Sequence, residues 1–296
     1  MNTIKKWFFV TRPWSFVVSA TPVIATSVFL IWKGYGPQFD WVNAVLALVG
    51  IMLFHAAGNV FSDYKDYLTG VDSKEAFCIP NLVSGEFKAE DYKRYALLLF
   101  FASCAVGLVL TFRSGWALLA VGIPGLILTL LYSKTKFIAL GDLDIFVVFG
   151  LLPMLGTSYV TVGVMDWSTL LLSIPVGIVT VAVLHANNTR DIPTDSRAGA
   201  KSFAALIGEK ASVRLYQAYM WTPIAYTAVM AVAGLFPFWT FIFVLCSAVI
   251  ALQNTRQAQK YFSEGLAAFN QLDLMTAKLQ MFSGLGLILG FIVAAL

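Results

Sequence analysis

Charged residues are scarce in this chain of 296 residues, since Lys, Arg, Asp and Glu make up only 12% of it, against about 25% in an average soluble domain. The hydrophobic share is 59% and the mean hydropathy is +0.78. This composition excludes an ordinary water-soluble surface. The net charge is only +4, so nothing indicates a nucleic-acid partner. The sequence therefore predicts an integral membrane protein whose surroundings are the lipid bilayer.

Cysteine and histidine are also scarce. The spacing of Cys78, Cys104 and Cys246 matches no metal or redox motif, and Cys104 and Cys246 are expected to pack in apolar segments. The N-terminus lacks the small-residue cleavage pattern of a signal peptide, so its first apolar segment is expected to remain as a helix. His55 and His185 both belong to apolar segments, where a histidine usually packs with its ring hydrogen-bonded. His185 is better placed for a site because it precedes an asparagine pair.

The charges occur in clusters, and the uncharged segments between the clusters have membrane-spanning length. About 20 apolar residues cross the hydrocarbon core as a helix. The segment between Arg12 and Lys33 has 20 uncharged residues, and the segment between Asp40 and Asp63 has 22. Counting such segments along the chain predicts an all-α fold: one domain, 1–296, of nine transmembrane helices around a central cavity.

Lysine and arginine gather on one side of these predicted helices. If the N-terminus is cytoplasmic, 18 of the 20 basic residues fall in cytoplasmic segments, and only Lys33 and Arg113 fall on the other side. Cytoplasmic loops of membrane proteins carry an excess of Lys and Arg. We therefore expect a cytoplasmic N-terminus and an external C-terminus, in a bacterial inner membrane.

Two of the expected cytoplasmic loops, 62–94 and 187–214, are long and rich in aspartate. Each begins where an apolar segment ends, with Asn and Asp at helical spacing. The similar charge layout indicates an internal repeat of a four-helix unit, 13–142 and 143–253. No extended sequence identity between the halves accompanies it.

The first loop opens with a cluster of oxygen-bearing side chains. If the preceding helix continues through Asp66, then Asn59, Ser62, Asp63 and Asp66 share one helix face. A glycine that can cap the helix follows, and Asp72 lies beyond it. Several carboxylates at one membrane surface are expected to need a cation between them.

The second loop opens with a similar cluster. On a continuous helix Asn187, Asp191 and Asp195 would stack at intervals of one turn. Pro193 clashes with the carbonyl four residues earlier if it lies inside a helix. We therefore expect either a kinked helix here or a turn that holds Asp195.

Magnesium suits these oxygen ligands, because Mg²⁺ commonly binds one or two carboxylates together with substrate phosphates. Two such clusters across a cavity would hold magnesium ions around a diphosphate. Lys136, Arg190 and Lys201 could then neutralise the remaining phosphate charge. The alternative is that the aspartates are solvated loop charges, but this does not explain why both clusters begin at the same end of a helix.

The two clusters resemble the aspartate-rich motifs of the UbiA superfamily of intramembrane prenyltransferases, over nearly the whole chain. The most similar branch is the menaquinone-pathway one, which prenylates 1,4-dihydroxy-2-naphthoate. The matching features are D-Y-x-D-x-x-x-G-x-D at 63–72, N-N-x-R-D-x-x-x-D-x-x-A-G at 187–199, Ala139-Leu140-Gly141-Asp142-Leu143, and Arg12-Pro13-Trp14. The resemblance implies magnesium-dependent transfer of a polyprenyl group from polyprenyl diphosphate to an aromatic acceptor.

The resemblance also implies roles for individual residues. The implied metal ligands are Ser62, Asp63, Asp66, Asp72, Asp191 and Asp195. The implied substrate-binding residues are Asn59, Tyr132, Lys136, Asn187, Arg190 and Lys201. The implied catalytic residues are Asp66, Asp191 and Lys136.

The chain departs from the family in three places. Ser62 stands where the family usually has an asparagine, so Asn59, one turn earlier, is an alternative ligand. Pro193 is unusual within the second motif. The segment from Tyr132 to Lys136 resembles a basic tyrosine–lysine segment of other branches. These departures concern the identity of the aromatic acceptor more than the class of reaction.

Other functions remain as alternatives. A superfamily enzyme could use another acceptor, such as a hydroxybenzoate, a haem vinyl group, a chlorophyllide or a glycerol phosphate. A transporter would place its ionisable residues near the bilayer midplane, whereas here they are expected at helix ends. A structural membrane protein would not need clustered aspartates.

Overall fold

A computed structural model describes residues 3–70, 81–135, 138–197, 199 and 201–296. Within these ranges the regular structure is helical, apart from one isolated bridge between the backbones of Ile138 and Lys201. The α-helices are α1 (Thr3–Val10), α2 (Phe16–Leu30), α3 (Trp41–Thr69), α4 (Ala89–Ser114), α5 (Leu119–Thr135), α6 (Gly141–Phe146), α7 (Leu152–Val162), α8 (Ser173–Arg190), α9 (Ile192–Arg197), α10 (Phe203–Ile207), α11 (Glu209–Val232), α12 (Phe238–Leu245), α13 (Ala248–Gln259), α14 (Tyr261–Glu264) and α15 (Leu272–Ala295).

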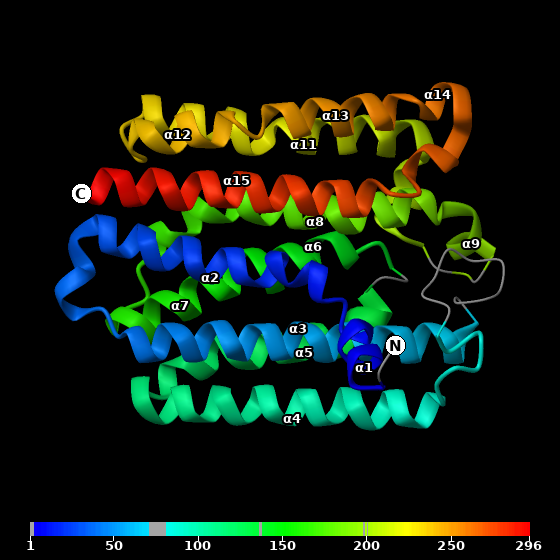
Figure 1. The fold of residues 1–296 in the computed structure, drawn as a ribbon, viewed down its shortest axis with the longest axis horizontal. Coiled ribbons are helices and arrows are strands. Elements are labelled where there is room, and N and C mark those ends of the chain that lie inside the picture. The colour runs from blue at the N-terminus through cyan, green and yellow to red at the C-terminus, as the bar shows by residue number, and fades with distance from the viewer. Residues whose placement is uncertain (1–2, 71–80, 136–137, 198, 200) are drawn as a thin grey trace.

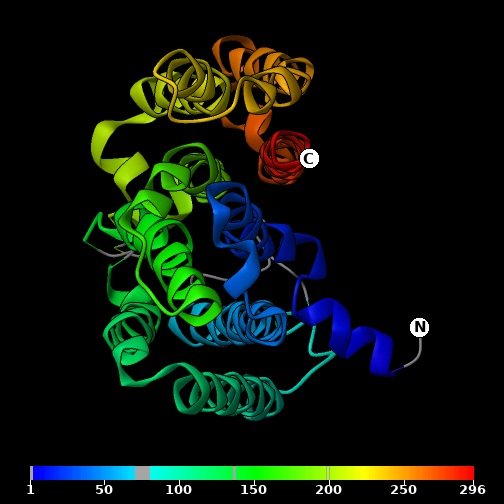
Figure 2. The ribbon, with the colours of Figure 1, turned by 90° about the vertical axis from the view of Figure 1, so that its left-hand side faces the viewer.

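The long helices lie roughly parallel to one axis and form a bundle (Figure 1). α3 packs against α4 and α2, and α8 packs against α11 and α15. Figure 2 shows the bundle from one end, with α3, α4 and α5 at one side and α11 to α13 at the other. The larger apolar core joins α2, α8, α11 and α15, and includes the buried residues Phe29, Tyr216 and Phe291.

Six helical segments are long and apolar enough to cross a membrane: 13–38, 41–69, 89–114, 141–162, 167–190 and 272–295. A seventh is obtained if α12 and the helical segment that follows it, bent by 47°, form one span. The apolar helix at 116–132 is shorter, and α11 is not among these segments. An all-helical, multi-pass membrane protein is thus confirmed, whereas the count of nine spans stays a prediction.

Side chains that face outward from the bundle agree with a lipid environment. Phe101, Phe112 and Val232 are large apolar residues that are 65%, 75% and 90% exposed. In water such a surface would be strongly unfavourable. In lipid tails it carries no such cost, because the hydrophobic effect operates only against water.

Glycine allows α15 to approach α12 closely. A Cβ atom at Gly290 would lie 2.4 Å from Thr240 Cα, and one at Gly286 would lie 2.8 Å from the backbone of Phe243. The two glycines are four residues apart and therefore lie on one helix face. Small residues at this spacing are a common means of packing helices in membranes, where apolar side chains gain little from leaving lipid.

Three of the described cluster aspartates lie on helices, Asp63 and Asp66 on α3 and Asp195 on α9, whereas Asp191 lies between α8 and α9. α3 continues through Asp66 to Thr69 and ends at Gly70, which has a φ of 74°. The condition for Asn59, Ser62, Asp63 and Asp66 to share one face, a helix that continues through Asp66, is therefore met, and Gly70 caps the helix as expected. α8 ends at Arg190, and α9 begins immediately after Asp191. Helices replace loops here because the backbone groups at the end of α8 are hydrogen-bonded: the Asp191 N–H donates to Asn187 O.

Pro193 marks this break between α8 and α9. It is the second residue of α9, a position where the backbone N–H has no intrahelical acceptor and its loss is tolerated. The backbone N–H of Asp195 donates to the carbonyl of Asp191 at 2.8 Å. The sequence offered a kinked helix or a turn that holds Asp195, and the structure has features of both: the helix is interrupted at Asp191, and the hydrogen bond from Asp195 to Asp191 lies across the break.

The two basic residues that oppose the general charge asymmetry are both neutralised by acids. Lys33 Nζ donates to Asp166 Oδ2 at 2.6 Å and to Ser168 Oγ at 2.7 Å. Arg113 forms an ion pair of 3.1 Å with Asp40. The positive-inside rule counts Lys and Arg and not net charge, so the pairing itself leaves the predicted distribution of 18 to 2 unchanged.

The Lys33–Asp166 pair makes stability depend on acidity. Burial by itself would raise the pKa of Asp166, but hydrogen bonds from Lys33, from the Ser168 hydroxyl and from the Ser168 amide outweigh it and hold this pKa at about 2. The lowered pKa means that the folded state favours the ionised carboxylate. Its stabilising contribution is therefore complete above the ordinary value of 3.8 and is lost as pH falls toward 2.

We predict that Asp166→Asn lowers the unfolding free energy at neutral pH by up to about 1 kcal/mol, the range of partly exposed ion pairs. The variant should also lose part of the pH dependence of the melting temperature between pH 4 and 2. Thermal unfolding of the detergent-solubilised protein measures both effects. Lys33→Met should give the same loss at neutral pH, and an unchanged acid profile in both variants would contradict the assignment.

Candidate functional site

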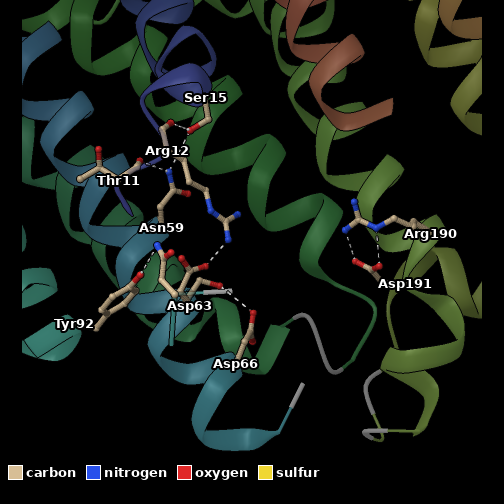
Figure 3. Close-up of polar contacts among 11 residues, drawn as sticks. Thr11, Arg12, Ser15, Asn59, Asp63, Asp66, Tyr92, Arg190 and Asp191 are labelled. Atoms are coloured by element: carbon tan, nitrogen blue, oxygen red, sulfur yellow. Dashed lines mark hydrogen bonds and ion pairs between the residues drawn. The ribbon is translucent and has the colours of Figure 1, made fainter. Parts of the chain in front are cut away.

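The two aspartate clusters meet at one end of the bundle. The C-terminal end of α3, the end of α8 and the short helix α9 all lie on the right of Figure 1. Figure 3 shows Asp63 and Asp66 on α3, and Arg190 and Asp191 on the chain leaving α8, all at this end. The expectation that both clusters occupy the same side of the protein is therefore met.

A cavity of about 240 Å³ opens between the clusters and reaches into the bundle. Of the residues predicted from the sequence, four line it: Asn59, Ser62, Tyr132 and Asn187. Further polar or charged lining residues are Arg12, Ser15, His55, Lys65, Thr129, Asp144, Thr180 and Asp273. The rest of the wall is mostly apolar and includes Phe54, Val148 and Phe149. The cavity therefore combines a polar end with an apolar interior.

Arg12 enters the site from the chain before α2. Its guanidinium pairs with Asp63 of α3, whose side chain is 7% exposed (Figure 3). The backbone of Arg12 has a φ of 55°, a left-handed conformation that is uncommon for residues other than glycine. Such strain persists only where the surroundings enforce it. Here Ser15 holds the bend, because both its N–H and its hydroxyl donate to the Arg12 carbonyl at 2.8 Å.

Asn59 and Ser62 differ in what their side chains bind. The amide nitrogen of Asn59 donates to Thr11 O at 3.0 Å and to Ser15 Oγ at 3.2 Å, so it fixes the segment that carries Arg12 (Figure 3). The hydroxyl of Ser62 lies 3.5 Å from Asp66 Oδ2, one turn later on α3. Ser62 thus lies beside a carboxylate, as its spacing predicted, while Asn59 supports the N-terminal segment.

In the second cluster, Arg190 and Asp191 form a two-pronged ion pair. Arg190 Nε and one terminal nitrogen each donate to an oxygen of Asp191 at 2.7 Å (Figure 3). Asn187 lines the cavity one turn before Asp191. Asp195 is buried on α9. The aspartates Asp191 and Asp195, like those of α3, are not among the cavity-lining residues, although residues next to them in the sequence, such as Ser62 and Lys65, are.

Three further residues predicted from the sequence, Asp72, Lys136 and Lys201, are not among the described cavity-lining residues. Asp72 and Lys136 lie outside the residues that the structure describes. Lys201 is exposed, and its backbone forms the bridge with Ile138. That bridge joins the chain after α5 to the chain after α9. Both segments are thereby held at the end of the bundle where the clusters meet.

The histidines reverse the expectation from the sequence. His55 lines the cavity, where its Nδ1 lies 3.1 Å from Ser19 Oγ. His185 does not line the cavity and is fully buried. Its Nδ1 lies 2.9 Å from Asp142 Oδ2 on α6, and its Nε2 lies 2.9 Å from Ser212 Oγ on α11. His185 faces away because its helix face is the one that packs between α6 and α11.

Asp142 is the centre of this buried network. Its Oδ2 lies against His185, and its Oδ1 accepts from Asn188 Nδ2 at 3.2 Å. His185 and Asn188 are three residues apart and lie on one face of α8. One carboxylate thus fastens the last turns of α8, next to Asn187 and Arg190, to α6.

Magnesium fits the side chains at the site. Among the buried oxygens without a hydrogen-bond partner in the described part of the chain are Asp63 Oδ2 and Asn187 Oδ1, one from each cluster. No group of three or more acidic, histidine or cysteine side chains in the described part of the chain is close enough to hold a metal alone. Both facts suit Mg²⁺, which commonly uses one or two carboxylates and completes its shell with phosphate and water.

A second cavity, of about 420 Å³, lies beside the first and is almost entirely apolar. It is formed by α3, α4, α5 and α7, and Phe54 and Val148 line both cavities. Two of its glycines, Gly107 and Gly122, have open space where a Cβ would stand. The polar site and this apolar groove therefore adjoin each other and share two apolar wall residues.

Sequence reasoning missed several of the lining residues. Arg12 enters the sequence analysis only as part of a short motif, and Asp144 is not singled out there. A signal did exist for Asp144, because it lies within the apolar segment 141–162, and an ionisable residue inside a membrane-spanning segment is unfavourable unless it has a role. Lys65 and Asp273 have no distinguishing pattern in the sequence.

Three comparisons with known proteins agree with one another. Residues 22–272 match the model of the UbiA prenyltransferase family. The protein named UbiA prenyltransferase domain-containing protein 1 is 31% identical in Homo sapiens, over 96% of this chain and 82% of that protein. Its counterpart in Gallus gallus is 32% identical, over 96% of this chain and 83% of that protein.

Solved structures show the same fold. The apo structure of a UbiA homolog from Aeropyrum pernix K1 superposes with a TM-score of 0.66 at 17% identity, over 92% of this chain and 97% of that one. A UbiA homolog from Archaeoglobus fulgidus bound to GPP and Mg²⁺ gives a TM-score of 0.56 at 15% identity, over 96% of this chain and 99% of that one.

We predict that Asp142→Ala destabilises the protein by at least about 2 kcal/mol, because it leaves His185 and Asn188 buried without their shared acceptor. Thermal unfolding measures the loss. The matched control is Glu90→Ala, which removes an exposed carboxylate paired within α4 and should change stability by less than about 0.5 kcal/mol. Equal melting temperatures for the two variants would show that Asp142 does not anchor α8.

Proposed function

The chain belongs to the UbiA prenyltransferase family, and we propose that it transfers a polyprenyl group from polyprenyl diphosphate to an aromatic acceptor in a magnesium-dependent reaction. The observation that carries the proposal is the cavity with a polar end and an apolar interior, flanked by two aspartate clusters. A prenyl diphosphate has the same division into a charged head and an apolar tail.

The polar end suits the diphosphate head. Asp63 and Asp66 from α3, with Asp191 and Asp195 from the second cluster, are the proposed magnesium ligands, with Ser62 beside them. Magnesium, when bound, acts as a Lewis acid that stabilises the charge of the leaving diphosphate. Asp72 and Lys136 keep their proposed roles as ligand and phosphate-binding residue, as do Arg190 and Lys201, whose charge is opposite to that of phosphate.

Transfer of the prenyl group breaks one bond of the donor and forms one bond to the acceptor. The C1–O bond of the allylic diphosphate breaks, and its electron pair leaves with the diphosphate. A π electron pair of the electron-rich acceptor ring forms the new bond to C1, and the ring regains its aromaticity by releasing a proton or, from a ring carboxylate, carbon dioxide. Phe54 and Phe149 line the cavity, and aromatic faces near a developing cation stabilise it by about 0.5–2 kcal/mol.

We propose 1,4-dihydroxy-2-naphthoate as the acceptor, in menaquinone biosynthesis, with loss of its carboxylate as carbon dioxide. The support is the motif similarity in 63–72, 139–143 and 187–199. Other quinone precursors or hydroxybenzoates are the alternative acceptors. The substrate-binding roles of Asn59, Tyr132 and Asn187 are supported by their position on the cavity wall.

The membrane arrangement is part of the same proposal. Nine spans, with a cytoplasmic N-terminus and an external C-terminus in a bacterial inner membrane, would place the polar end of the cavity at the cytoplasmic surface. The support is the distribution of Lys and Arg. A water-soluble acceptor and a charged diphosphate could then reach the site from the cytoplasm.

The apolar groove suits the distal isoprene units of a long donor. Its lining includes Leu108, Ile123 and Leu126, and it adjoins the site at Phe54 and Val148. A tail lying there would be shielded from water while its diphosphate stays at the polar end. Gly122 is a suitable position to block the groove, because a Cβ there meets no described atom within 4 Å.

We predict that Asp66→Ala and Asp191→Ala each lower turnover by at least about 100-fold, since loss of a group that stabilises transition-state charge typically costs about 3 kcal/mol. The assay uses purified protein, geranyl diphosphate, 1,4-dihydroxy-2-naphthoate and Mg²⁺, with product identified by mass. A chelator should abolish turnover. Glu90→Gln is the control that should retain it. A folded Asp191→Ala enzyme with near-normal activity would exclude the second cluster from the site.

We also predict that Gly122→Phe discriminates between donors by length. With geranyl diphosphate the variant should keep most of its activity, and with octaprenyl diphosphate it should lose at least about 10-fold in kcat/KM, the effect of steric misfit in an apolar pocket. Gly122→Ala is the control with a small side chain. Its kcat/KM for each donor should equal that of the original protein. An equal loss with both donors would mean that the distal tail lies elsewhere.

A further inference from the structure

Two aspartates of α6, Asp142 and Asp144, are two residues apart but have different surroundings. Both are more than nine-tenths buried. Both oxygens of Asp142 are engaged, by His185 and Asn188. Asp144 Oδ2 accepts from Thr135 Oγ1 at 2.7 Å, whereas Asp144 Oδ1 has no hydrogen-bond partner among the described residues. The first aspartate is therefore satisfied by the protein and the second only in part.

A partly satisfied carboxylate is costly in this position. Asp144 lies in a segment apolar enough to cross the membrane, 141–162, where ionisable residues usually mark a functional site. No ion pair within the described ranges includes Asp144. A buried acceptor left unpaired carries the full cost of its lost hydration, and the cost is larger if the group is charged. A group from outside the chain that donates a hydrogen bond would remove that cost.

Asp144 is placed to receive such a group, because it lines the cavity between the clusters. Ile145, Val148 and Phe149 follow it along the same wall and are apolar. A flat ring can pack against these side chains while a substituent of the ring reaches the carboxylate. Asn59 and Ser62 stand on α3, another wall of the same cavity.

The charge of Asp144 restricts the chemistry of the ligand. Without a cation between them, a carboxylate repels diphosphate, which disfavours direct contact with the donor head. It also repels a ring carboxylate. A neutral hydroxyl donates a hydrogen bond to a carboxylate readily, and charge-assisted bonds of this kind are the stronger ones. The complementary group is therefore a hydroxyl on the aromatic ring.

We propose that Asp144 Oδ1 accepts a hydrogen bond from a hydroxyl of the acceptor, so that the acceptor of this enzyme is a hydroxyarene selected by Asp144. The inference rests on the proposed prenyl transfer and adds the residue that recognises the acceptor by a hydrogen bond. A ring hydroxyl that donates to a carboxylate also gains electron density, which favours attack of the ring on the allylic carbon.

The test compares acceptors with and without one hydroxyl. Activity with 1,4-dihydroxy-2-naphthoate is measured against 1-hydroxy-2-naphthoate and 4-hydroxy-2-naphthoate, with geranyl diphosphate as donor. The original protein should prefer the dihydroxy acceptor over one of the two by at least about 100-fold in kcat/KM, as sites built to bind a hydroxyl do. Asp144→Asn should reduce that preference at least about 10-fold. The intrinsic reactivity of each ring is the same in both assays. It therefore cancels when the acceptor preference of the variant is compared with that of the original protein.

Two further variants separate recognition from structure. Asp273→Asn changes another cavity-lining carboxylate, on α15, and should leave the preference unchanged. Thr135→Val removes the internal donor to Asp144 but keeps the carboxylate, so it should retain the preference for the dihydroxy acceptor. This variant can be assayed even where Asp144→Asn is too unstable. Loss of preference in Thr135→Val would mean that local structure, and not the Asp144 carboxylate, selects the acceptor.

The remaining outcomes are also decisive. An Asp144→Asn enzyme that keeps the original preference overturns the inference, while the proposed prenyl transfer stands. An altered magnesium dependence in Asp144→Asn would assign Asp144 to the metal site and also overturn it. Absence of prenyl transfer by the original protein with every acceptor would instead overturn the proposed function.

Discussion

A polar group inside the hydrocarbon core costs several kcal/mol unless another part of the protein satisfies it, and the arrangement of this molecule follows from that cost. Backbone groups are satisfied within helices, so the described chain is a helical bundle. Side chains that cannot be satisfied inside a helix are gathered at its ends or tied to one another. Lys33 and Arg113 each pair with an acid at one end of the bundle, and the aspartate clusters occupy the other.

The same cost explains why the site is built from separate parts of the chain. Asp63 is almost buried on α3, and its partner Arg12 comes from the segment before α2. Asn59 and Ser15 hold that segment in a bent conformation with Arg12 at a φ of 55°. Helix α8, which carries the second cluster, is held by a different carboxylate, Asp142. Two independent anchors thus place the two clusters around one cavity.

α6 links structure to chemistry over a very short distance. One of its aspartates fastens α8, and the other, two residues on, faces the cavity with an oxygen that no described residue satisfies. Residues one turn apart on a helix share a face, whereas residues two apart point in different directions. One side of this six-residue helix can therefore hold α8 in place while the other side faces the substrate cavity.

Much of the fold followed from the sequence by itself, because bilayer thickness sets the length of a spanning helix and the charge-free segments have that length. The multi-pass helical class, the helix through Asp66 and the common end of the clusters were all predictable for that reason. Helical periodicity also placed Ser62 beside Asp66, since it depends only on neighbours in the chain.

Contacts between distant segments were decided only by the tertiary structure. Nothing in the sequence indicates that Arg12 pairs with Asp63, or that His185 faces Asp142 while His55 lines the cavity. The local sequence around Asp142 and Asp144 also gives no sign that the two carboxylates have different surroundings. The sequence determines which face of its own helix a side chain occupies, but what that face meets depends on how the helices pack, and packing is set by the whole bundle at once.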